Sequence, residues 1–395
     1  MKILYVSDVY FPRVNGVSTS IATFRDELTR LGHTVHLIAP DYPGIDHPSM
    51  RPSPDLLRMP SWRVPFDPED RMMGRRRVLA LGDRLAAEGF DLVHIQTPFV
   101  AHRAGVALAR RLGVPVVETY HTYFEEYLYH YVPFAPRGLM RALARRFSRS
   151  QCNEVDAVVV PSRAMAEALR GYGVDAPMER IPTGLRPEDF RGGNGNEFRQ
   201  RFRIHDGRPT LVHIGRLAFE KNVEFILRML RRVVDEMPEV LLVIAGEGPA
   251  QSSLKRLVAR LRLQENVLFV GYLDRSGDLL DCYRAADAFV FASKTETQGL
   301  VVLEAMALAV PVVSTAYMGT RDILEPGRGC LVADDDESDF AHKVLLLLRN
   351  PELRTKLRRD ANDYALGSWN AAVMAERMVE LYRRLLRHKG LRAVA

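Results

Sequence analysis

Short apolar runs rich in β-branched residues alternate with longer stretches of helical periodicity along most of the chain. In the first half, the amphipathic stretches 18–31 and 78–87 separate such runs. The strands expected there are residues 3–7, 34–39, 92–95, 114–119 and 157–160. Because these runs are apolar throughout rather than alternating, they are typical of a parallel sheet that helices cover on both faces.

The alternation is interrupted at residues 191–196, Arg-Gly-Gly-Asn-Gly-Asn, and then begins again. A segment so rich in glycine and asparagine is not expected to pack as a regular element, so we predict a linker here. The strands expected after it are residues 210–214, 240–245, 267–270, 288–292 and 310–314, with helices such as 223–234 and 300–307 between them. The repeated pattern predicts an α/β protein with two Rossmann-like, doubly wound parallel sheets and ligand sites at the carboxyl ends of the strands.

The expected domains are residues 1–195 and residues 196–369, facing one another. A last helix, about residues 370–388, follows the second sheet without a partner strand, and we expect it to pack back on the first domain. Residues 43–68 contain many prolines and are expected to form a long surface loop. The length of 395 residues agrees with two domains, since one hydrophobic core rarely serves so long a chain.

The composition, 47% hydrophobic and 26% charged residues, is that of ordinary globular material. No apolar run reaches the roughly 18 residues that a membrane-spanning helix needs. Three widely spaced cysteines, Cys152, Cys282 and Cys330, predict neither a disulfide framework nor a metal site, and we expect them to be buried in a protein of the reducing cytoplasm. The net charge of +6 is concentrated in residues 101–150 and 381–395. No recognised nucleic-acid motif accompanies it, so we expect an anionic surface, not nucleic acid, as the partner.

Chemistry is indicated most clearly by residues 293–307, where a strand is expected to end near Ala292, a loop to carry Glu296 and a helix to begin near Gly299. Amide groups at a helix start carry partial positive charge, which suits an anion such as a diphosphate. A carboxylate such as Glu304 suits a pair of adjacent hydroxyls, because each oxygen can accept from one of them. The alternative is two solvated glutamates beside a core helix.

Two cations, Arg216 and Lys221, follow the first strand of the second domain. The end of this strand is where such sheets bind phosphates, and fixed cations there could neutralise charge on a departing nucleoside diphosphate. The alternative is a surface arginine and lysine that cap a loop.

In the first domain, Gly16 allows close backbone approach before the first helix, with Ser18 as the expected N-cap. His121, at a strand end, could donate to a sugar hydroxyl or carry a proton. An ordinary strand–helix turn and a structural histidine are the alternatives.

Two further patterns are weaker. Gly246-Glu247-Gly248 begins like a dinucleotide-binding fingerprint, but Gln251 stands where the third glycine should be. The run of aspartates at 334–336 is expected to be a solvated loop rather than a metal site.

A basic amphipathic helix is expected around residues 137–150. Its arginines, Arg137, Arg141, Arg145 and Arg149, repeat every four residues and share one face. Leu139, Leu143 and Phe147 form another face, and an aromatic-rich stretch, residues 120–134, precedes the helix. This combination suits an anionic membrane surface. The alternative is a surface helix that its leucines hold on the core.

Taken together, the chain resembles the retaining glycosyltransferases of family 4, which have the GT-B fold of two Rossmann-like domains facing across a cleft. The resemblance covers essentially the whole chain. It is carried by Asn15-Gly16, Leu31-Gly32-His33, His121, Pro182-Thr183-Gly184, Arg216 with Lys221, Glu296 with Glu304, and Trp369.

The resemblance implies specific roles. Gly16 would place a backbone amide on the donor phosphate, and Arg216 and Lys221 would hold the diphosphate. Glu296 would contact the transferred sugar, which His121 would also face, and Glu304 would bind the ribose hydroxyls. Amides around Gln298, Gly299 and Leu300 would support the phosphates. The catalytic residues implied are His121, Arg216, Lys221 and Glu296, with no metal and no other cofactor.

Residues 121–153 and 295–299 look most like family members that glycosylate diacylglycerol, and lipid mannosyltransferases share much of this pattern. The resemblance therefore implies transfer of a hexose from a donor of the UDP-glucose or GDP-mannose type to a membrane lipid, at the inner face of the cell membrane. Gln96 departs from the pattern, since many relatives carry histidine there, and this affects the acceptor side. A nucleotide-sugar epimerase or hydrolase, and a family 4 transferase with a soluble or polysaccharide acceptor, remain as alternatives.

Overall fold

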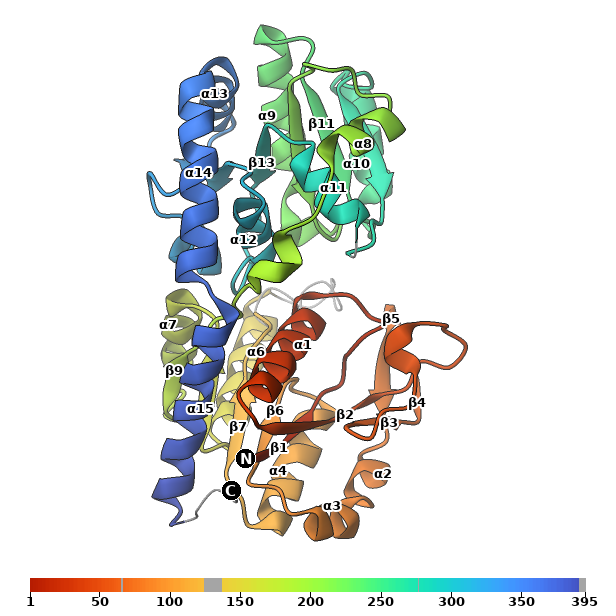
Figure 1. Cartoon of the computed structure of the whole chain (residues 1–395), viewed down its shortest axis with the longest axis vertical. Coiled ribbons are helices and arrows are strands. Elements are labelled where there is room, and N and C mark those ends of the chain that lie inside the picture. The colour runs from red at the N-terminus through yellow and green to blue at the C-terminus, as the bar shows by residue number, and fades with distance from the viewer. Residues whose placement is uncertain (65–66, 124–136, 276, 391–395) are drawn as a thin grey trace. The chain divides into compact units, whose positions relative to one another are not determined.

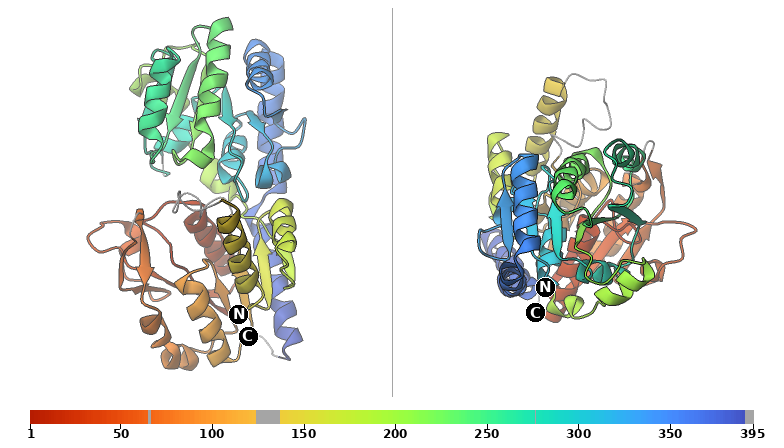
Figure 2. Two further views of the ribbon diagram at one scale, coloured as in Figure 1. Left: turned by 180° about the vertical axis from the view of Figure 1, so that it is seen from behind. Right: turned by 90° about the horizontal axis from the view of Figure 1, so that it is seen from above.

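The computed structural model describes residues 1–64, 67–123, 137–275 and 277–390. The chain forms two compact units, one of Met1–Gly184 with Ala371–Ala395 and the other of Leu185–Asn370. Each unit is built on a parallel sheet between layers of helices (Figure 1, Figure 2), so the predicted α/β class with two Rossmann-like sheets is confirmed.

The first sheet has the strand order β3-β2-β1-β6-β7-β8-β9, with every pair parallel. Its strands are β1 (Lys2–Val6), β2 (Thr34–Pro40), β3 (Leu56–Met59), β6 (Leu92–Ile95), β7 (Val116–Thr119), β8 (Ala157–Val160) and β9 (Met178–Arg180). The order reverses between β1 and β6, which is where ligands bind in such sheets.

The helices of the first unit include one from the far end of the chain. They are α1 (Gly16–Arg30), α2 (Arg75–Leu79), α3 (Gly82–Glu88), α4 (Val100–Leu112), α6 (Arg137–Cys152), α7 (Arg163–Gly171) and α15 (Ala371–His388). Met378 and Tyr382 of α15 share a buried core with Phe24 and Leu28 of α1, so α15 completes one face of the first sheet (Figure 1).

A buried polar network also joins α15 to this sheet. The Tyr382 hydroxyl lies 2.6 Å from Nδ1 of His94 and 3.3 Å from the hydroxyl of Tyr5. Nε2 of His94 is in turn 2.7 Å from Oγ1 of Thr119. Because all four side chains are buried, each polar group needs this partner, and the network fixes the position of the helix.

The segment expected to be a long loop, residues 43–68, contains regular structure. It holds a short 3-10 helix (Pro48–Met50), β3, β4 (Ser61–Val64) and the start of β5 (Asp67–Met73), which pairs with β4 in an antiparallel ribbon. The strands β3 and β4 are short and only partly buried, so they lack the continuous apolar run that marks the central strands. Backbone pairing rather than side-chain pattern defines them.

The second sheet has the order β12-β11-β10-β13-β14-β15, again all parallel. Its strands are β10 (Thr210–Ile214), β11 (Leu241–Ala245), β12 (Val267–Gly271), β13 (Ala288–Phe291), β14 (Val312–Thr315) and β15 (Cys330–Ala333). Alternate residues of β10 and β11 enter separate apolar cores, one on each face. The chain order reverses between β10 and β13.

The helices of the second unit divide between the two faces. The first core holds side chains of α8 (Gly195–Arg201), α11 (Asp278–Arg284), α12 (Leu300–Ala307) and α14 (Pro351–Ser368). The second holds those of α9 (Val223–Glu236), α10 (Gln251–Arg260) and α13 (Glu337–Arg349).

The glycine-rich segment expected to be a linker belongs instead to the second unit. Leu185, Phe190 and Phe198 lie in its apolar core, and the unit begins at Leu185 rather than at residue 196. A Cβ on Gly195 would lie 2.4 Å from the carbonyl oxygen of Arg284, so glycine here permits close packing against the end of α11. The amide of Leu185 donates to the carbonyl of Trp369 at 2.6 Å, so the two segments that join the units run side by side.

Candidate functional site

Lys221 and Glu296 meet at the carboxyl edge of the second sheet. Lys221 ends a 3-10 turn (Phe219–Lys221) after β10, and Glu296 lies in the loop after β13. Nζ of Lys221 donates to Oε1 of Glu296 at 2.6 Å. Since β10 and β13 are the strands between which the chain order reverses, the structure places this ion pair where doubly wound sheets form their ligand sites.

The backbone around this ion pair is fixed by its neighbours. Asn222 adopts a left-handed conformation with φ of 56°, and its Nδ2 donates to the carbonyl of Ala292 at 3.2 Å. The amide of Gly319, in the 3-10 turn Met318–Asp322, donates to the carbonyl of Glu296 at 2.8 Å. A Cβ on Gly319 would lie 2.1 Å from the carbonyl oxygen of Thr297, so only glycine lets the two loops approach this closely.

Burial and charge act in opposite directions on Glu296. Burial alone would raise the pKa of its carboxyl group, but the Lys221 ammonium outweighs it, so the pKa lies below its usual value. His213, on β10, is fully buried, and burial lowers its pKa to about 4. His213 is therefore neutral at physiological pH, and it donates from Nδ1 to the carbonyl of Val290 at 3.1 Å. The half-buried Arg216 follows Gly215 in the same loop as Lys221.

The predicted helix start at Gly299 is present. Gly299 precedes α12 with φ of 97°, and it has no side chain to occupy the amides of the first turn. Gln298 precedes Gly299 and Leu300 follows it. The chain therefore runs directly from Glu296 of the ion pair to the start of α12. These features suit the anion expected at this position.

Glu304, in α12, is 2% exposed and has two partners. Its Oε1 is paired with the Arg275 guanidinium, and its Oε2 accepts from the hydroxyl of Tyr283 at 3.1 Å. The sequence indicated Glu304 but neither partner. Arg275 is one arginine in a short loop after β12, and Tyr283 has the spacing of an ordinary core residue of α11, so no pattern marked them.

Gly16 and His121 lie in the first unit. A Cβ on Gly16 would meet no atom within 4 Å, so the packing of the unit does not itself require glycine there. The side chain of Asn15 caps α1, because its Oδ1 accepts from the amide of Ser18 at 2.8 Å. The expectation that Ser18 is the N-cap is therefore wrong, since Ser18 is already inside the helix.

His121 lies beside other polar groups at the carboxyl edge of the first sheet. Its Nε2 is 3.2 Å from Oε1 of Gln96, and burial lowers the pKa of His121 to about 4. Asp8, after β1, accepts from Oγ1 of Thr97 at 3.0 Å and from the amide of Ala101 at 3.1 Å. Burial raises the pKa of Asp8 to about 6. A single aspartate after a strand carries no recognisable pattern, and the sequence did not single it out.

The helix α6 exposes arginine side chains to solvent. Arg141, Arg145 and Arg149 are exposed, and the guanidinium of Arg145 lies 5.5 Å from the centre of the Tyr172 ring. The side chain of Arg137 and residues 124–136 lie outside the described residues. No described helix is long and apolar enough to cross a membrane.

The leucines of α6 do not hold it on the core. Leu139 is 55% exposed and Leu143 is 49% exposed, whereas Ala144, Ser148 and Cys152 form the buried side of the helix. The alternative of a surface helix packed by its leucines is therefore wrong.

The two weaker sequence patterns have structural explanations. A Cβ on Gly246 would lie 2.0 Å from the carbonyl oxygen of Gly215, and one on Gly248 would lie 2.5 Å from that of Leu217. These glycines let the loops after β10 and β11 pack together, which supports the loop that carries Arg216. In the aspartate run, Asp336 caps α13 by accepting from two amides at 2.9 Å. Asp335 pairs with Lys294.

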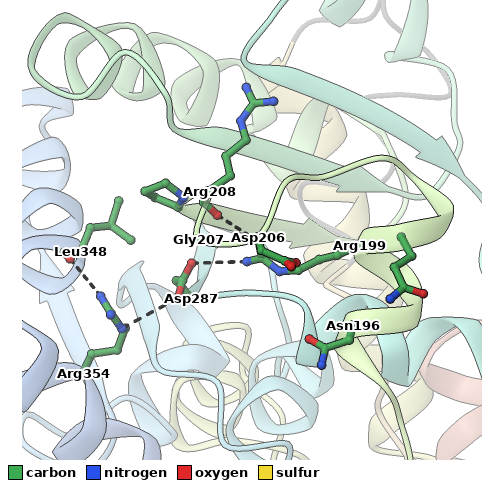
Figure 3. Close-up of a pocket in the computed structure, with 10 residues that line it drawn as sticks. Asn196, Arg199, Asp206, Gly207, Arg208, Asp287, Leu348 and Arg354 are labelled. Carbon is green, nitrogen blue, oxygen red and sulfur yellow. Dashed lines mark hydrogen bonds and ion pairs between the residues drawn. The ribbon is translucent and has the colours of Figure 1, made fainter.

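A hollow of about 610 Å³ lies at the opposite edge of the second sheet, near the amino ends of β10 and β13 (Figure 3). Arg199 and Arg354 surround Asp287 there, and both also donate to backbone carbonyls, those of Ala285 and Leu348. Arg208 donates to the carbonyl of Glu239 instead. These contacts tie helix ends to the sheet, so we interpret this hollow as structural.

Comparisons with known proteins cover both units. The family model Glycosyltransferase Family 4 matches residues 14–189, and the model Glycosyl transferases group 1 matches residues 194–364. The alpha-monoglucosyldiacylglycerol synthase of Streptococcus pneumoniae is 35% identical over 322 residues, which are 80% of this chain and 71% of that protein. A GDP-mannose-dependent alpha-mannosyltransferase of Mycobacterium tuberculosis is 30% identical over 380 residues, 93% of this chain and 91% of that one.

Solved structures share the fold over nearly the whole chain. Sucrose-phosphate synthase from Thermosynechococcus elongatus has a TM-score of 0.78 at 19% identity and covers 98% of this chain with 100% of its own. The Anabaena protein HepE, in complex with UDP-glucose, has a TM-score of 0.76 at 16% identity with the same coverage. These similarities, with the confirmed sheets and the sequence relatives, show that the chain belongs to glycosyltransferase family 4 and has the GT-B fold.

Proposed function

We propose that this glycosyltransferase moves a hexose from a nucleotide-sugar to a membrane lipid, with diacylglycerol as the first candidate, and retains the α configuration. The observation that carries the donor part is the Lys221–Glu296 ion pair at the point where the strand order of the second sheet reverses. The uncapped start of α12 follows directly in the chain. Cation, carboxylate and helix start together suit a sugar that is linked to a diphosphate.

In the proposed mechanism, Lys221 and Arg216 neutralise the charge that develops on the departing nucleoside diphosphate. Fixed cations can do this without a metal ion. Glu296 accepts hydrogen bonds from hydroxyls of the transferred sugar. Because its pKa is lowered, the carboxyl group is ionised at neutral pH and can accept on both oxygens. The acceptor attacks from the side that the diphosphate leaves, and a phosphate oxygen takes the acceptor proton.

Gly16 and His121 have proposed roles on the same donor. Gly16 presents a backbone amide to a phosphate, and a side chain at this position would occupy space that the unit itself leaves open. His121 is neutral at physiological pH, because burial lowers its pKa to about 4. A neutral imidazole ring can donate one hydrogen bond to a sugar hydroxyl without adding a charge to the site.

The lipid acceptor is supported by two observations. The Streptococcus pneumoniae relative is an alpha-monoglucosyldiacylglycerol synthase. In addition, α6 exposes Leu139 and Leu143, and the exposed Arg146 lies next to them on the helix surface. Exposed apolar side chains beside cations suit the headgroup region of an anionic bilayer. We propose that α6 holds the enzyme peripherally on the inner face of the cell membrane.

A thermal-shift screen of UDP, GDP and ADP and their sugars tests the donor. The correct nucleotide should raise the melting temperature, since a ligand at 100 times its Kd adds about 2.7 kcal/mol of stability. The nucleotides of a single base should give the largest shift, and the sugar donor with that base should yield an α-linked glycolipid with diacylglycerol. Sugar released or isomerised equally fast without an acceptor would instead indicate a hydrolase or epimerase. Transfer only to soluble or polysaccharide acceptors would contradict the lipid assignment.

Co-sedimentation with phosphatidylglycerol vesicles tests the membrane surface. Leu139→Ser and Leu143→Ser should reduce bound protein severalfold, because they remove exposed apolar contacts without disturbing the buried side of α6. Leu346→Ser, on α13 of the second unit, is the matched control, since Leu346 is 40% exposed. Equal binding of all three variants and of the unchanged protein would refute the role of α6.

A further inference from the structure

Glu304 is a carboxylate that the fold has almost removed from water. The residue is 2% exposed, while the side chain of its partner Arg275 is 36% exposed. A buried carboxylate without a cation is costly, and such a group usually takes up a proton instead. The Arg275 guanidinium supplies the positive charge from the loop that follows β12.

Two elements besides α12 fix the orientation of this carboxylate. Arg275 is paired with Oε1, and the Tyr283 hydroxyl in α11 donates to Oε2 at 3.1 Å. Tyr283 is fully buried, and burial together with the Glu304 charge raises its pKa well above the usual value, so it remains a neutral donor. Tyr272, in the loop after β12, is the other titratable group acting on Arg275.

The two contacts leave capacity for a ligand. Each carboxylate oxygen has two lone pairs, so the single donor that the described residues place on Oε1 and the one on Oε2 leave an acceptor position on each. Two adjacent hydroxyls of a ribose need two such positions on one charged group.

We propose that Arg275 is a positioning residue of the donor site, which holds the Glu304 carboxylate in the orientation that accepts the two ribose hydroxyls of the nucleotide-sugar. The inference rests on the proposed function and on the ribose-binding role that the family resemblance implies for Glu304. Arg275 acts through Glu304, and it has no role on a nucleotide that lacks these hydroxyls.

The test compares the nucleoside diphosphate selected by the thermal-shift screen with its 2′,3′-dideoxy analogue. Calorimetry gives the ratio of the two Kd values for the unchanged protein, Arg275→Met and Arg275→Lys. Arg260→Met is the matched control, since Arg260 is an exposed arginine at the end of α10 in the same unit.

The unchanged protein and Arg260→Met should prefer the ribose form about tenfold or more. In Arg275→Met this preference should fall towards one, because Glu304 loses the partner that orients its Oε1 atom. Arg275→Lys should keep most of the preference, since it restores the charge. A merely structural role for Arg275 would change both Kd values together and leave the ratio unaltered.

Two outcomes separate the inference from its foundation. If the unchanged protein binds both nucleotides equally, Glu304 does not recognise ribose, and the role that the resemblance implies for it fails. If the unchanged protein prefers the ribose form and Arg275→Met keeps the same preference, the inference on Arg275 is overturned.

Should Arg275→Met fail to fold, the comparison can be made with Glu304 replaced by Gln, because no buried carboxylate is then left without a cation. The inference expects the double variant Arg275→Met/Glu304→Gln to show the same ratio as Glu304→Gln alone. A further fall in the double variant would contradict it.

Discussion

Charged residues that lie far apart in the chain meet in the candidate site. Lys221 and Glu296 each follow an apolar run, and the parallel sheet brings the two runs together at one edge, where the side chains join at 2.6 Å. The sequence did not indicate Arg275 or Asp8, because a single charged residue in a loop belongs to no recognisable pattern. Their partners come from other elements, and only the packed fold shows them.

Lys221→Ala should lower turnover by a factor of about 10² to 10³, since it removes a fixed positive charge from the departing diphosphate. Steady-state kinetics with the identified donor measures this, and circular dichroism checks the fold. Lys356→Ala, at an exposed position of α14, should leave turnover unchanged. Near-normal turnover of Lys221→Ala would remove Lys221 from the catalytic residues.

Gly16→Ala should fold at least as well as the unchanged protein, because alanine favours a helix and its methyl group meets no atom within 4 Å. It should nevertheless weaken donor binding about tenfold or more, if a phosphate approaches the backbone here. Gly171→Ala is the control, since Gly171 is also helical and its Cβ would also meet nothing. Equal donor Kd values for the two variants would show that Gly16 does not contact the donor.

Among the elements, those buried on both faces were predicted best. Residues 92–95, 157–160, 210–214 and 300–307 match β6, β8, β10 and α12 residue for residue. The edge strands β3 and β9 and the ribbon of β4 and β5 were missed. The side chains of β3, β4 and β9 are only partly buried, and none of the four strands carries a continuous apolar run. Backbone hydrogen bonds to a neighbour define an edge strand, and a side-chain pattern does not report them.

The attachment of α15 depends on a hydroxyl as well as on apolar area. Tyr382→Phe should lower the free energy of unfolding of the first unit by about 1–3 kcal/mol, since it leaves buried groups of His94 and Tyr5 without this partner. Urea titration followed by far-UV circular dichroism measures the change. Val373→Ala, at a 49% exposed position of the same helix, should have little effect. Equal effects of the two substitutions would show that the network contributes nothing to stability.

At the scale of the whole molecule, two sheets could be predicted, but the point of division could not. Glycine serves both flexible linkers and close backbone contacts, and the sequence of residues 191–196 does not distinguish the two uses. Gly195 is needed because the carbonyl of Arg284 lies where its Cβ would be, so this segment is packed rather than extended. The chain consequently leaves the first unit at Gly184 and returns to it at Ala371.

Both units should lose stability in mild acid. Burial lowers the pKa of His94 to about 3 and that of His213 to about 4, whereas an unfolded histidine titrates near 6.5. The unfolded chain therefore binds more protons below pH 6.5, and each histidine should cost up to about 1.4 kcal/mol per pH unit as the pH falls towards its folded pKa. The stabilisation is complete above the unfolded pKa.

Urea unfolding at pH 7, 6 and 5 measures this loss. His213→Phe should make the second unit less sensitive to acid, because its ring lies among Phe289 and Phe291 and phenylalanine keeps the shape without titrating. An unchanged pH slope in this variant would assign the acid sensitivity to other groups.

Because the helix that closes one face of the first sheet follows the whole second unit in the chain, the first unit cannot be completed before the second has been synthesised. The ribosome delivers every residue of the second unit while the first still exposes apolar side chains that await α15. A frameshift or premature stop codon just before the codons of α15 would therefore damage the half of the enzyme encoded first. Nascent first units would also be the form of this protein most dependent on chaperones.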